Sequence, residues 1–285
     1  MESLFCTIST SSHLFRVIAL FNSIRKFKKS AELYCLIVDG TESDSPPIIA
    51  GLIWIFPEQI KHEFRIAEIF QKYAPASDPL RWALKPSLMM HVQKREHCQN
   101  VFYCDSDLYF VSNFDFLDKY LTENRILLSP HNRISDPEVD APWFTTNFKD
   151  GIFNGGFVGA NKNAVSELKW WEKATAFACE INFAEGRYVD QKYLDMMPAL
   201  FEKIAIVRHP GCNVAYWNRH ECVRSKKNGE IRINENWPIV FIHFTNDLMQ
   251  AIDKGDDPLL ADYLHEYRVQ IHLANKSLSL ISADK

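Results

Sequence analysis

The sequence predicts an α/β protein with a mostly parallel central sheet flanked by helices. Short apolar runs, which predict strands, alternate along the chain with longer segments in which apolar residues recur at helical spacing. The first 38 residues already contain one complete strand, helix and strand in that order. Strands that alternate with helices indicate a parallel sheet whose two faces are both covered.

The first half of the chain supplies most of the predicted sheet. A Ser/Thr-rich segment precedes the first helix and is typical of a helix cap. Pro86 interrupts a later helical segment near its start. In chain order, the sequence predicts strands at residues 4–8, 33–38, 100–104 and 126–129, and helices at residues 14–24, 58–73, 80–93 and 115–120.

The second half continues the alternation after one irregular segment. Residues 131–151 are polar, contain proline and show no period, so they are the best candidate for a functional loop. The later predicted strands are residues 155–160, 204–207, 231–233 and 239–243, and the later predicted helices are residues 164–179, 189–201 and 258–274. We expect one domain over residues 1–246 and a helical carboxyl-terminal extension, 247–285, packed on it.

Composition excludes several classes of protein. The 285 residues carry 32 Lys plus Arg against 36 Asp plus Glu, a net charge of −4, which argues against a nucleic-acid partner. A hydrophobic fraction of 47% excludes global disorder. Seven scattered cysteines without a Cys-x-x-Cys pair indicate a reducing compartment. The first residues lack a basic signal region, and the longest apolar stretch falls short of the roughly 20 residues that span a bilayer. We therefore expect a cytoplasmic protein.

Two acids follow the predicted strand at residues 100–104. Asp105 and Asp107 stand two positions apart, with apolar runs before and after them. In open α/β sheets, ligands bind beyond the carboxyl ends of strands, so this pair lies where a site is expected. Two carboxylates suit Mg²⁺ or Mn²⁺, and such a cation can hold a diphosphate. A capped turn with solvated acids is the alternative that the spacing leaves open.

A histidine ends a later apolar strand in the same manner. His243 follows the run of residues 239–242. A single histidine after a strand is more often structural, but together with the acidic pair it completes a mixed carboxylate and imidazole ligand set. Mn²⁺ suits that set better than Mg²⁺ does.

Four sequence blocks, in this order, resemble glycosyltransferase family 8 of the GT-A (Rossmann-like) fold, which includes glycogenin and bacterial lipopolysaccharide galactosyltransferases. Residues 102–107 resemble the family's Asp-x-Asp strand end, and residues 152–157, with Asn154, resemble its Phe-Asn-(Ala/Gly)-Gly strand. Residues 189–194 are similar to its Asp-Gln block, and residues 242–244 to its late His-Phe motif. The resemblance covers about residues 4–246. It implies the GT-A nucleotide-diphospho-sugar transferase fold.

The resemblance also implies roles for individual residues. Asp105, Asp107 and His243 would bind Mn²⁺ or Mg²⁺, and the nucleotide-sugar donor would be a co-substrate, with a UDP-sugar favoured. The catalytic residues that face the transferred sugar would be Asn154, Asp190 and Gln191. The residues that hold the donor would be Thr7, Ser9, Asp39, Lys85 (with Arg81 as its alternate), Asp105, Ser106 and Asp107.

The chain departs from the family after the His-Phe motif. The family usually supplies Gly and a later Lys that contacts the phosphates, whereas Thr245 follows here and the next lysine is Lys254. Lys254, Arg219 or His220 would have to substitute for that lysine.

The acceptor side rests on the irregular loop. Trp143, Phe144 and Phe148, with His131 and Asn132, form the apolar and amide mixture that stacks on sugar rings. Retention of anomeric configuration would follow the family. Inversion stays open, because a loop acid could act as the base; the candidates are Asp136, Glu138, Asp140 and Asp150.

Two functions remain. The first is a metal-dependent hexosyltransferase that uses a hydroxyl of a saccharide or a lipid-linked acceptor in the assembly of bacterial surface polysaccharide or lipopolysaccharide. The second is a non-catalytic nucleotide-sugar or carbohydrate-binding module of the same fold. A basic cluster, Arg25, Lys26, Lys28 and Lys29, is either a solvated helix end or a patch for peripheral contact with the inner face of a membrane. The sequence leaves the oligomeric state undetermined.

Overall fold

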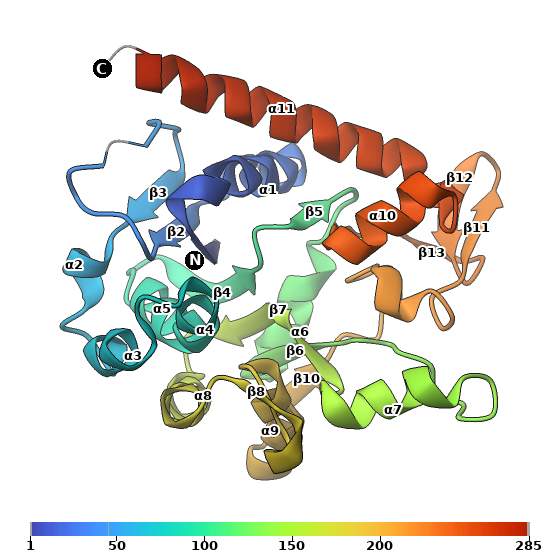
Figure 1. Ribbon diagram of the computed structural model, residues 1–285, viewed down its shortest axis with the longest axis horizontal. Coiled ribbons are helices and arrows are strands. Elements are labelled where there is room, and N and C mark those ends of the chain that lie inside the picture. Colours follow the sequence, from blue (N-terminus) through green and yellow to red (C-terminus); the bar gives the residue numbers. More distant parts are fainter. Residues whose placement is uncertain (1, 45, 284–285) are drawn as a thin grey trace.

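A seven-stranded sheet forms the centre of the protein (Figure 1). The structure is a computed structural model that describes residues 2–44 and 46–283. The strand order is β10-β6-β7-β4-β1-β2-β3, and β7 alone is antiparallel to its neighbours. The strands are β1 (Glu2–Ser9), β2 (Leu33–Ile37), β3 (Leu52–Ile55), β4 (Cys98–Cys104), β6 (Ile126–Pro130), β7 (Phe153–Asn161) and β10 (Ile204–Ile206). The predicted mostly parallel α/β fold is confirmed.

Helices cover both faces of the sheet, and strand β1 shows why. Its Leu4, Cys6 and Ile8 pack into one hydrophobic core and its Phe5 into the other. A strand that is buried on both faces needs apolar residues at both even and odd positions. The first core includes side chains of α3 (Ile66–Tyr73), α4 (Ser77–Ala83), α5 (Lys85–Gln93) and α8 (Val165–Phe177), and the second those of α1 (Leu14–Phe27) and α6 (Phe116–Glu123).

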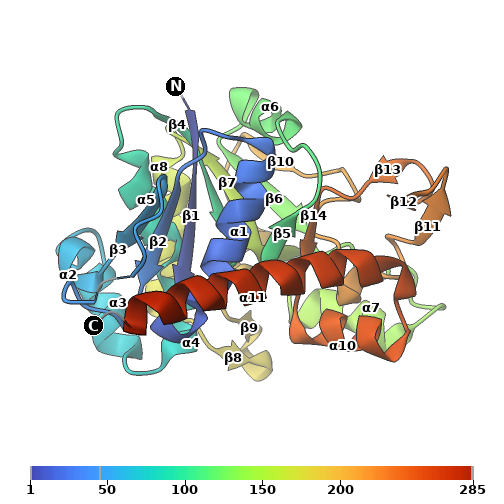
Figure 2. The same cartoon turned by 90° about the horizontal axis from the view of Figure 1, so that it is seen from above.

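The carboxyl-terminal helices lie outside the sheet on the α1 side. Helix α10 (Asn246–Lys254) is followed by α11 (Ala261–Ala283), which packs across α1 (Figure 2). These helices follow the predicted boundary at residue 246, and the division into a domain and an extension stays a prediction. Among the described residues, no helix combines the length and apolar character needed to cross a membrane.

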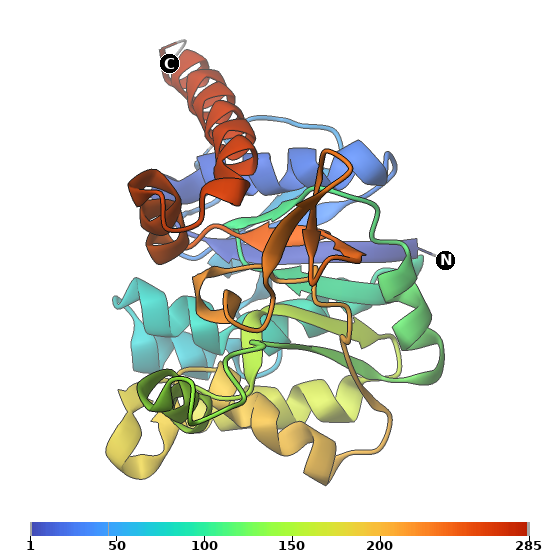
Figure 3. The same ribbon diagram turned by 90° about the vertical axis from the view of Figure 1, so that its right-hand side faces the viewer.

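Smaller elements surround the carboxyl end of the sheet. Strands β5 (Leu108–Phe110) and β14 (Phe241–His243) form a two-stranded antiparallel sheet. Strands β11 (Arg224–Lys227), β12 (Glu230–Ile233) and β13 (Trp237–Pro238) form a three-stranded sheet, which faces the viewer in Figure 3 and projects from the body in Figure 2. The remaining elements are α2 (Pro57–Ile60), α7 (Ala141–Lys149), α9 (Met197–Leu200), the β8 (Ile181–Asn182) and β9 (Arg187–Tyr188) hairpin, and the 3-10 turns η1 (Ser11–His13), η2 (Phe183–Glu185), η3 (Gln191–Met196), η4 (Tyr216–Asn218) and η5 (Pro258–Leu260).

Several predicted helices differ in the structure, for local reasons. The helix predicted at residues 58–73 is wrong as one element, because Phe64 has a left-handed φ of 47° and separates α2 from α3. Residues 80–93 are divided between α4 and α5, with Pro86 in the first turn of α5. Residues 189–201 form η3 and then α9, whose first turn holds Pro198.

Two other predictions need correction, and one strand of the central sheet was missed. Residues 131–151 are not wholly irregular, since they contain α7, which Asp140 caps by accepting a hydrogen bond from the Trp143 amide at 3.0 Å. The strand β3 was not predicted. The strand predicted at residues 231–233 belongs to the projecting sheet rather than to the central one. All seven cysteine side chains are buried and unpaired.

Candidate active site

The two acids lie on the turn between β4 and β5. The Leu108 amide donates to the Asp105 carbonyl at 3.0 Å and closes the turn. The Asp105 amide donates to the carbonyl of Gly156 at 2.8 Å, which fastens the turn to β7. Ser106, between the acids, is buried. The end of a buried strand thus presents both carboxylates beyond the carboxyl edge of the sheet.

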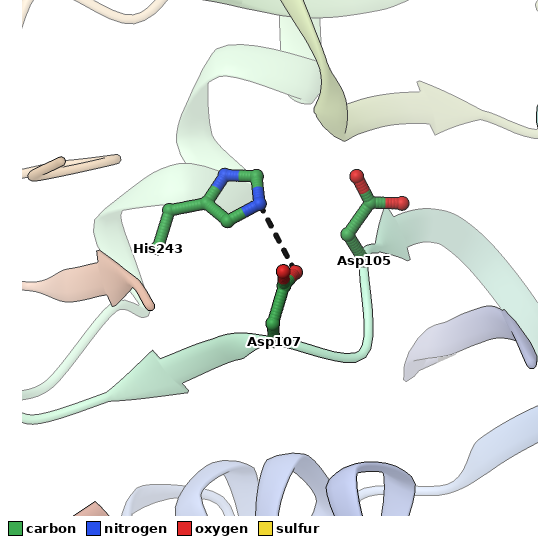
Figure 4. A group of neighbouring side chains, drawn as sticks. All are labelled: Asp105, Asp107 and His243. Carbon is green, nitrogen blue, oxygen red and sulfur yellow. Dashed lines mark ion pairs between the residues drawn. The ribbon is translucent and has the colours of Figure 1, made fainter. Parts of the chain in front are cut away.

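The pairing of β5 with β14 brings His243 to this turn. His243 lies opposite Leu108 in that antiparallel pair, and the Phe244 amide donates to the Asp107 carbonyl at 2.9 Å. The Nε2 atom of His243 is 3.0 Å from Oδ1 of Asp107, and Asp105 faces the same space (Figure 4). Burial acts to lower the pKa of His243, but the carboxylate of Asp107 outweighs it and holds that pKa above its ordinary value.

The three side chains fit a divalent cation. Each offers one ligand atom, and these atoms lie within 4.8 Å of one another. The Nδ1 atom of His243 contacts Oδ1 of Asn213 at 3.2 Å, so Nε2 is the nitrogen that faces the acids. Two carboxylate oxygens and one imidazole nitrogen are a donor set that suits Mn²⁺ or Mg²⁺.

Glycine at position 156 leaves room for these ligands. A Cβ atom there would lie 2.7 Å from Asn154 Oδ1, 2.7 Å from His243 Cε1 and 2.8 Å from Asp105 Oδ2. At Gly155, a Cβ atom would lie 2.4 Å from Asp190 Oδ2. The paired glycines therefore let β7 pass directly beside the acids and the histidine.

Lys85 is a buried cation between two carboxylates. Its side chain is 3% exposed, and its Nζ atom lies 3.1 Å from Asp190 Oδ2 and 3.5 Å from Asp105 Oδ1. Nζ also donates to the Gly155 carbonyl at 3.0 Å. Burial acts to lower the pKa of Lys85, but Asp105 and Asp190 outweigh it and hold that pKa above its ordinary value. The alternate residue, Arg81, pairs with Asp78 instead.

The sugar-facing residues suggested by the resemblance lie beside Lys85. The side-chain Nδ2 of Asn154 donates to Nε2 of His131 at 3.2 Å, and its Oδ1 accepts from the backbone amide of Gly156 at 3.0 Å. Gln191 donates to the Asp150 carbonyl at 2.9 Å. A carboxamide has two N–H groups and two lone pairs, so both side chains keep capacity for further hydrogen bonds. Burial raises the pKa of Asp190 although Lys85 opposes that shift.

A cavity of about 490 Å³ opens over these groups. Lys85, Asp105, Asn154, Asp190, Gln191 and His243 line it, and so do five aromatic residues, namely Trp82, Trp143, Tyr188, Tyr216 and Trp217. Of the five predicted acceptor residues, Trp143 and His131 line the cavity, whereas Asn132, Phe144 and Phe148 do not. Of the four loop acids, Asp150 lines it, 3.0 Å from Arg133.

Three of the residues expected to hold the donor, Thr7, Ser9 and Asp39, do not line this cavity. Thr7 and Ser9 are fully buried, and Ser9 donates to the Thr10 carbonyl at 3.1 Å. Asp39 is exposed, accepts hydrogen bonds from the amide and hydroxyl of Ser11, and lines a second hollow of about 420 Å³. The structure therefore does not bring these three residues to the metal ligands.

Two of the three candidates for the absent phosphate lysine lie near residues that line the cavity. Lys254 lines a small neighbouring hollow with Tyr216 and Asp247, both of which also line the main cavity. Arg219 lies over the ring of Tyr216, with its guanidinium carbon 4.7 Å from the ring centre, and His220 is exposed.

Four residues that contact this ligand set or line the cavity were not assigned to it from the sequence, although three of them belong to the polar and aromatic segment 209–218. Arg16, on α1, lies 3.9 Å from Asp107 Oδ2. Asn213 contacts His243, Trp217 packs edge-on against both His131 and His243, and Tyr216 packs against Trp143. Arg16 is a half-buried residue of α1, and the other three lie in or beside the short turn η4, where no regular spacing indicates a site.

Most of the basic cluster is engaged within the protein. Lys26 pairs with Glu266 at 3.0 Å, and Lys28 pairs with Asp118 at 3.1 Å. Arg25 donates to two backbone carbonyls, those of Lys29 and Ala50. These contacts favour the interpretation of this cluster as an ordinary helix end.

The sequence is similar to uncharacterized proteins of Bacillus subtilis. No protein-family model matches the sequence. The chain is 24% identical over 265 residues to the uncharacterized protein YfnF of Bacillus subtilis, covering 89% of this chain and 84% of that one. It is 26% identical over 249 residues to YfnD of the same organism, covering 85% and 76% respectively.

Solved structures of glycosyltransferases share the architecture. The galactosyltransferase LgtC, in complex with donor and acceptor sugar analogues, superposes with a TM-score of 0.52 at 15% identity, covering 92% of this chain and 96% of that chain. Mouse xyloside xylosyltransferase 1 superposes with a TM-score of 0.50 at 12% identity, covering 87% and 98% respectively. The chain therefore has the GT-A glycosyltransferase fold.

Proposed function

We propose that this protein is a metal-dependent glycosyltransferase that moves a hexosyl unit from a nucleotide-diphosphate sugar to a hydroxyl of a saccharide or lipid-linked acceptor. The observation that carries the proposal is the convergence of ligand atoms of Asp105, Asp107 and His243 within 4.8 Å of one another. Asp105 and His243 line the cavity that Asn154 and Gln191 also line. The sequence blocks that resemble family 8 and the GT-A fold point to the same chemistry.

The proposed metal site addresses the leaving group. Departure of a nucleoside diphosphate places negative charge on the leaving phosphate, and a bound Mn²⁺ or Mg²⁺ supplies the positive charge that stabilises it. Asp105, Asp107 and His243 would hold that ion. Their combined charge also disfavours a bare diphosphate, so nucleotide affinity is expected to depend on the cation.

Lys85 and the amides would act on the sugar side. Lys85 holds Asp190 and Asp105 in fixed positions through contacts of 3.1 and 3.5 Å. The carboxamides of Asn154 and Gln191 can each donate to and accept from sugar hydroxyls. In this proposal the three residues orient the sugar so that its anomeric carbon faces the acceptor.

We propose retention of anomeric configuration and a UDP-sugar donor, both on the resemblance to family 8. Asp150 is the one loop acid on the cavity, so it is the base that inversion would require. Burial holds the pKa of Asp150 above its ordinary value, although Arg133 opposes that shift. An NMR spectrum of the product's anomeric proton distinguishes the two outcomes.

The acceptor and setting are also part of the proposal. Trp143, Tyr216 and Trp217 present aromatic rings to the cavity, and such rings stack on sugars. We propose a saccharide or lipid-linked saccharide acceptor in bacterial surface polysaccharide or lipopolysaccharide assembly, in the cytoplasm or at the inner face of the membrane.

A donor screen tests the function. Binding of UDP-, GDP- and dTDP-sugars is measured by calorimetry with Mn²⁺ and with EDTA, and then release of nucleoside diphosphate is followed with saccharide acceptors. We expect Mn²⁺-dependent binding in the wild type, its loss in Asp107→Asn and His243→Ala, and its persistence in Asp115→Asn, a control on an exposed acid. Nucleotide-sugar binding of equal affinity with Mn²⁺ and with EDTA would contradict the proposal. Binding without transfer to any acceptor would favour the non-catalytic module.

A further inference from the structure

The imidazole of His243 has a second, buried partner. Its Nδ1 atom lies 3.2 Å from Oδ1 of Asn213, on the side of the ring opposite to Asp107. Asn213 is 0% exposed and His243 is 5% exposed. The side-chain nitrogen of Asn213, Nδ2, makes no hydrogen bond with the residues that the structure describes. Within the described part of the chain, the polar contact of the Asn213 side chain is therefore the one with His243.

We infer that Asn213 is the positioning residue that sets the orientation and tautomer of His243 for metal binding; this inference rests on the proposed metal-dependent function. A carboxamide oxygen only accepts hydrogen bonds, so contact with Oδ1 places the proton of neutral His243 on Nδ1. Nε2 then keeps its lone pair and points at the acids. Partners of this kind commonly fix the ligand histidines of metal sites.

The backbone at position 213 suits few residues. Asn213 has a φ of 59°, in the left-handed region, where glycine and asparagine are favoured over other residues. The adjacent amide of Val214 donates to the Phe241 carbonyl at 3.1 Å, and the His243 amide donates to the Val214 carbonyl at 2.9 Å. The segment that carries Asn213 is thus fastened to β14, the strand that carries His243.

A buried polar network holds this segment from the other side. Asn218 donates to the Asn213 carbonyl at 2.8 Å and accepts from the Ala215 amide at 3.0 Å. Arg224 donates to the Ala215 carbonyl at 2.6 Å and forms an ion pair of 3.1 Å with Asp257. Asp257 lies between α10 and η5, so the carboxyl-terminal extension supports the position of His243.

Substitution of Asn213 tests the inference without disturbing the backbone. Asn213→Gly keeps access to positive φ and removes the acceptor, whereas Asn213→Asp keeps an acceptor at the same place. The change to aspartate removes no hydrogen bond, because the side-chain nitrogen of Asn213 makes none with the described residues. Asn228→Gly is the matched control, because Asn228 has a φ of 52° on the exposed β11–β12 hairpin.

Mn²⁺ affinity is measured from the electron paramagnetic resonance signal of free Mn²⁺, with and without UDP, alongside circular dichroism in EDTA. We expect Asn213→Gly to raise the Mn²⁺ Kd about 10- to 100-fold. Asn213→Asp should restore the affinity to within a few-fold of the wild type, and Asn228→Gly should not change it. A role in folding alone would lower the melting temperature of Asn213→Gly and leave the Kd unchanged.

The failures of the two proposals are distinguishable. A wild type that binds Mn²⁺ neither with nor without UDP would overturn the proposed metal-dependent function, and this inference with it. A wild type that binds Mn²⁺, together with a folded Asn213→Gly variant of equal affinity, would overturn the role of Asn213 alone. An Asn213→Asp variant as weak as Asn213→Gly would also overturn it, because the acceptor would then not be what matters.

Discussion

Replacement of Gly156 by alanine should disable the metal site while sparing the fold. The added Cβ atom would lie 2.8 Å from Asp105 Oδ2 and 2.7 Å from His243 Cε1, and ordinary contact begins at 3.4 Å. Asp105 would have to retreat by 3.4 − 2.8 = 0.6 Å and His243 by 3.4 − 2.7 = 0.7 Å. Metal–ligand distances tolerate changes of about 0.2 Å. The displaced side chains would therefore no longer match one ion.

Gly159→Ala is the control for this prediction, because Gly159 lies on the same strand. A Cβ atom at position 159 would lie 2.9 Å from Phe102 Cε1 and 3.1 Å from Leu127 Cβ, both of them apolar neighbours remote from the ligands. Overpacking of this kind costs about 1–3 kcal/mol. Both variants should lose unfolding free energy in urea with EDTA, but only Gly156→Ala should raise the Mn²⁺ Kd by about tenfold or more.

The comparison of the two glycine variants can fail in a definite way. If Gly156→Ala is folded and its Mn²⁺ Kd stays within twofold of the wild type, the reasoning from close approach is refuted. If Gly159→Ala weakens Mn²⁺ binding equally, the effect reports general destabilisation of β7 rather than displacement of the ligands.

Three further substitutions test two buried charged or titratable side chains of the cavity, Lys85 and His131, and the capping of helix α7. Lys85→Met leaves Asp190 buried without its cation, and it should cost about 3–5 kcal/mol of unfolding free energy in urea at pH 7; a loss under about 1 kcal/mol would contradict this. Burial, with help from Arg133, holds the pKa of His131 well below its ordinary value. The folded protein therefore keeps His131 neutral, while in the unfolded chain this histidine takes up a proton below about pH 6.5. The free energy of unfolding should thus decrease as the pH is lowered through this range, by at most about 1.4 kcal/mol per pH unit. His131→Gln should reduce that slope in denaturation curves with EDTA at pH 7.5, 6.5 and 5.5, and equal slopes would argue against a buried neutral histidine. Asp140→Ala removes the α7 cap and should cost about 1 kcal/mol, with faster amide exchange at Trp143; unchanged exchange there would show that the cap does not hold the helix.

Local sequence was sufficient where the structure depends on neighbours in the chain. The strands β1, β2 and β4 were predicted because continuous apolar runs are needed when both sheet faces are covered. The sequence also identified Asp105 and Asp107 together, since both follow one strand on one turn. Helix boundaries were less predictable: Phe64, for example, takes a left-handed conformation that no composition signal announces.

Residues that act through distant contacts could not be predicted. Asn213 and Trp217 reach His243 because an irregular segment folds back along β14. Arg16 reaches Asp107 from the first turns of α1. Thr7, Ser9 and Asp39 were suggested by a family resemblance, and they do not line the cavity that contains Asp105 and His243. Their role in holding the donor stays a prediction.

The sequence by itself determined the α/β class, the strands β1, β2 and β4 and the acidic turn, because periodicity and strand ends are local properties. Only the tertiary structure decided that His243 stands 3.0 Å from Asp107, since that distance depends on the register between β5 and β14. Only the tertiary structure showed why residue 156 is glycine, since the space beside it belongs to Asp105, Asn154 and His243. Strand register and close approach join segments far apart in the chain, and a shift of one residue would point every side chain of a strand to its other face.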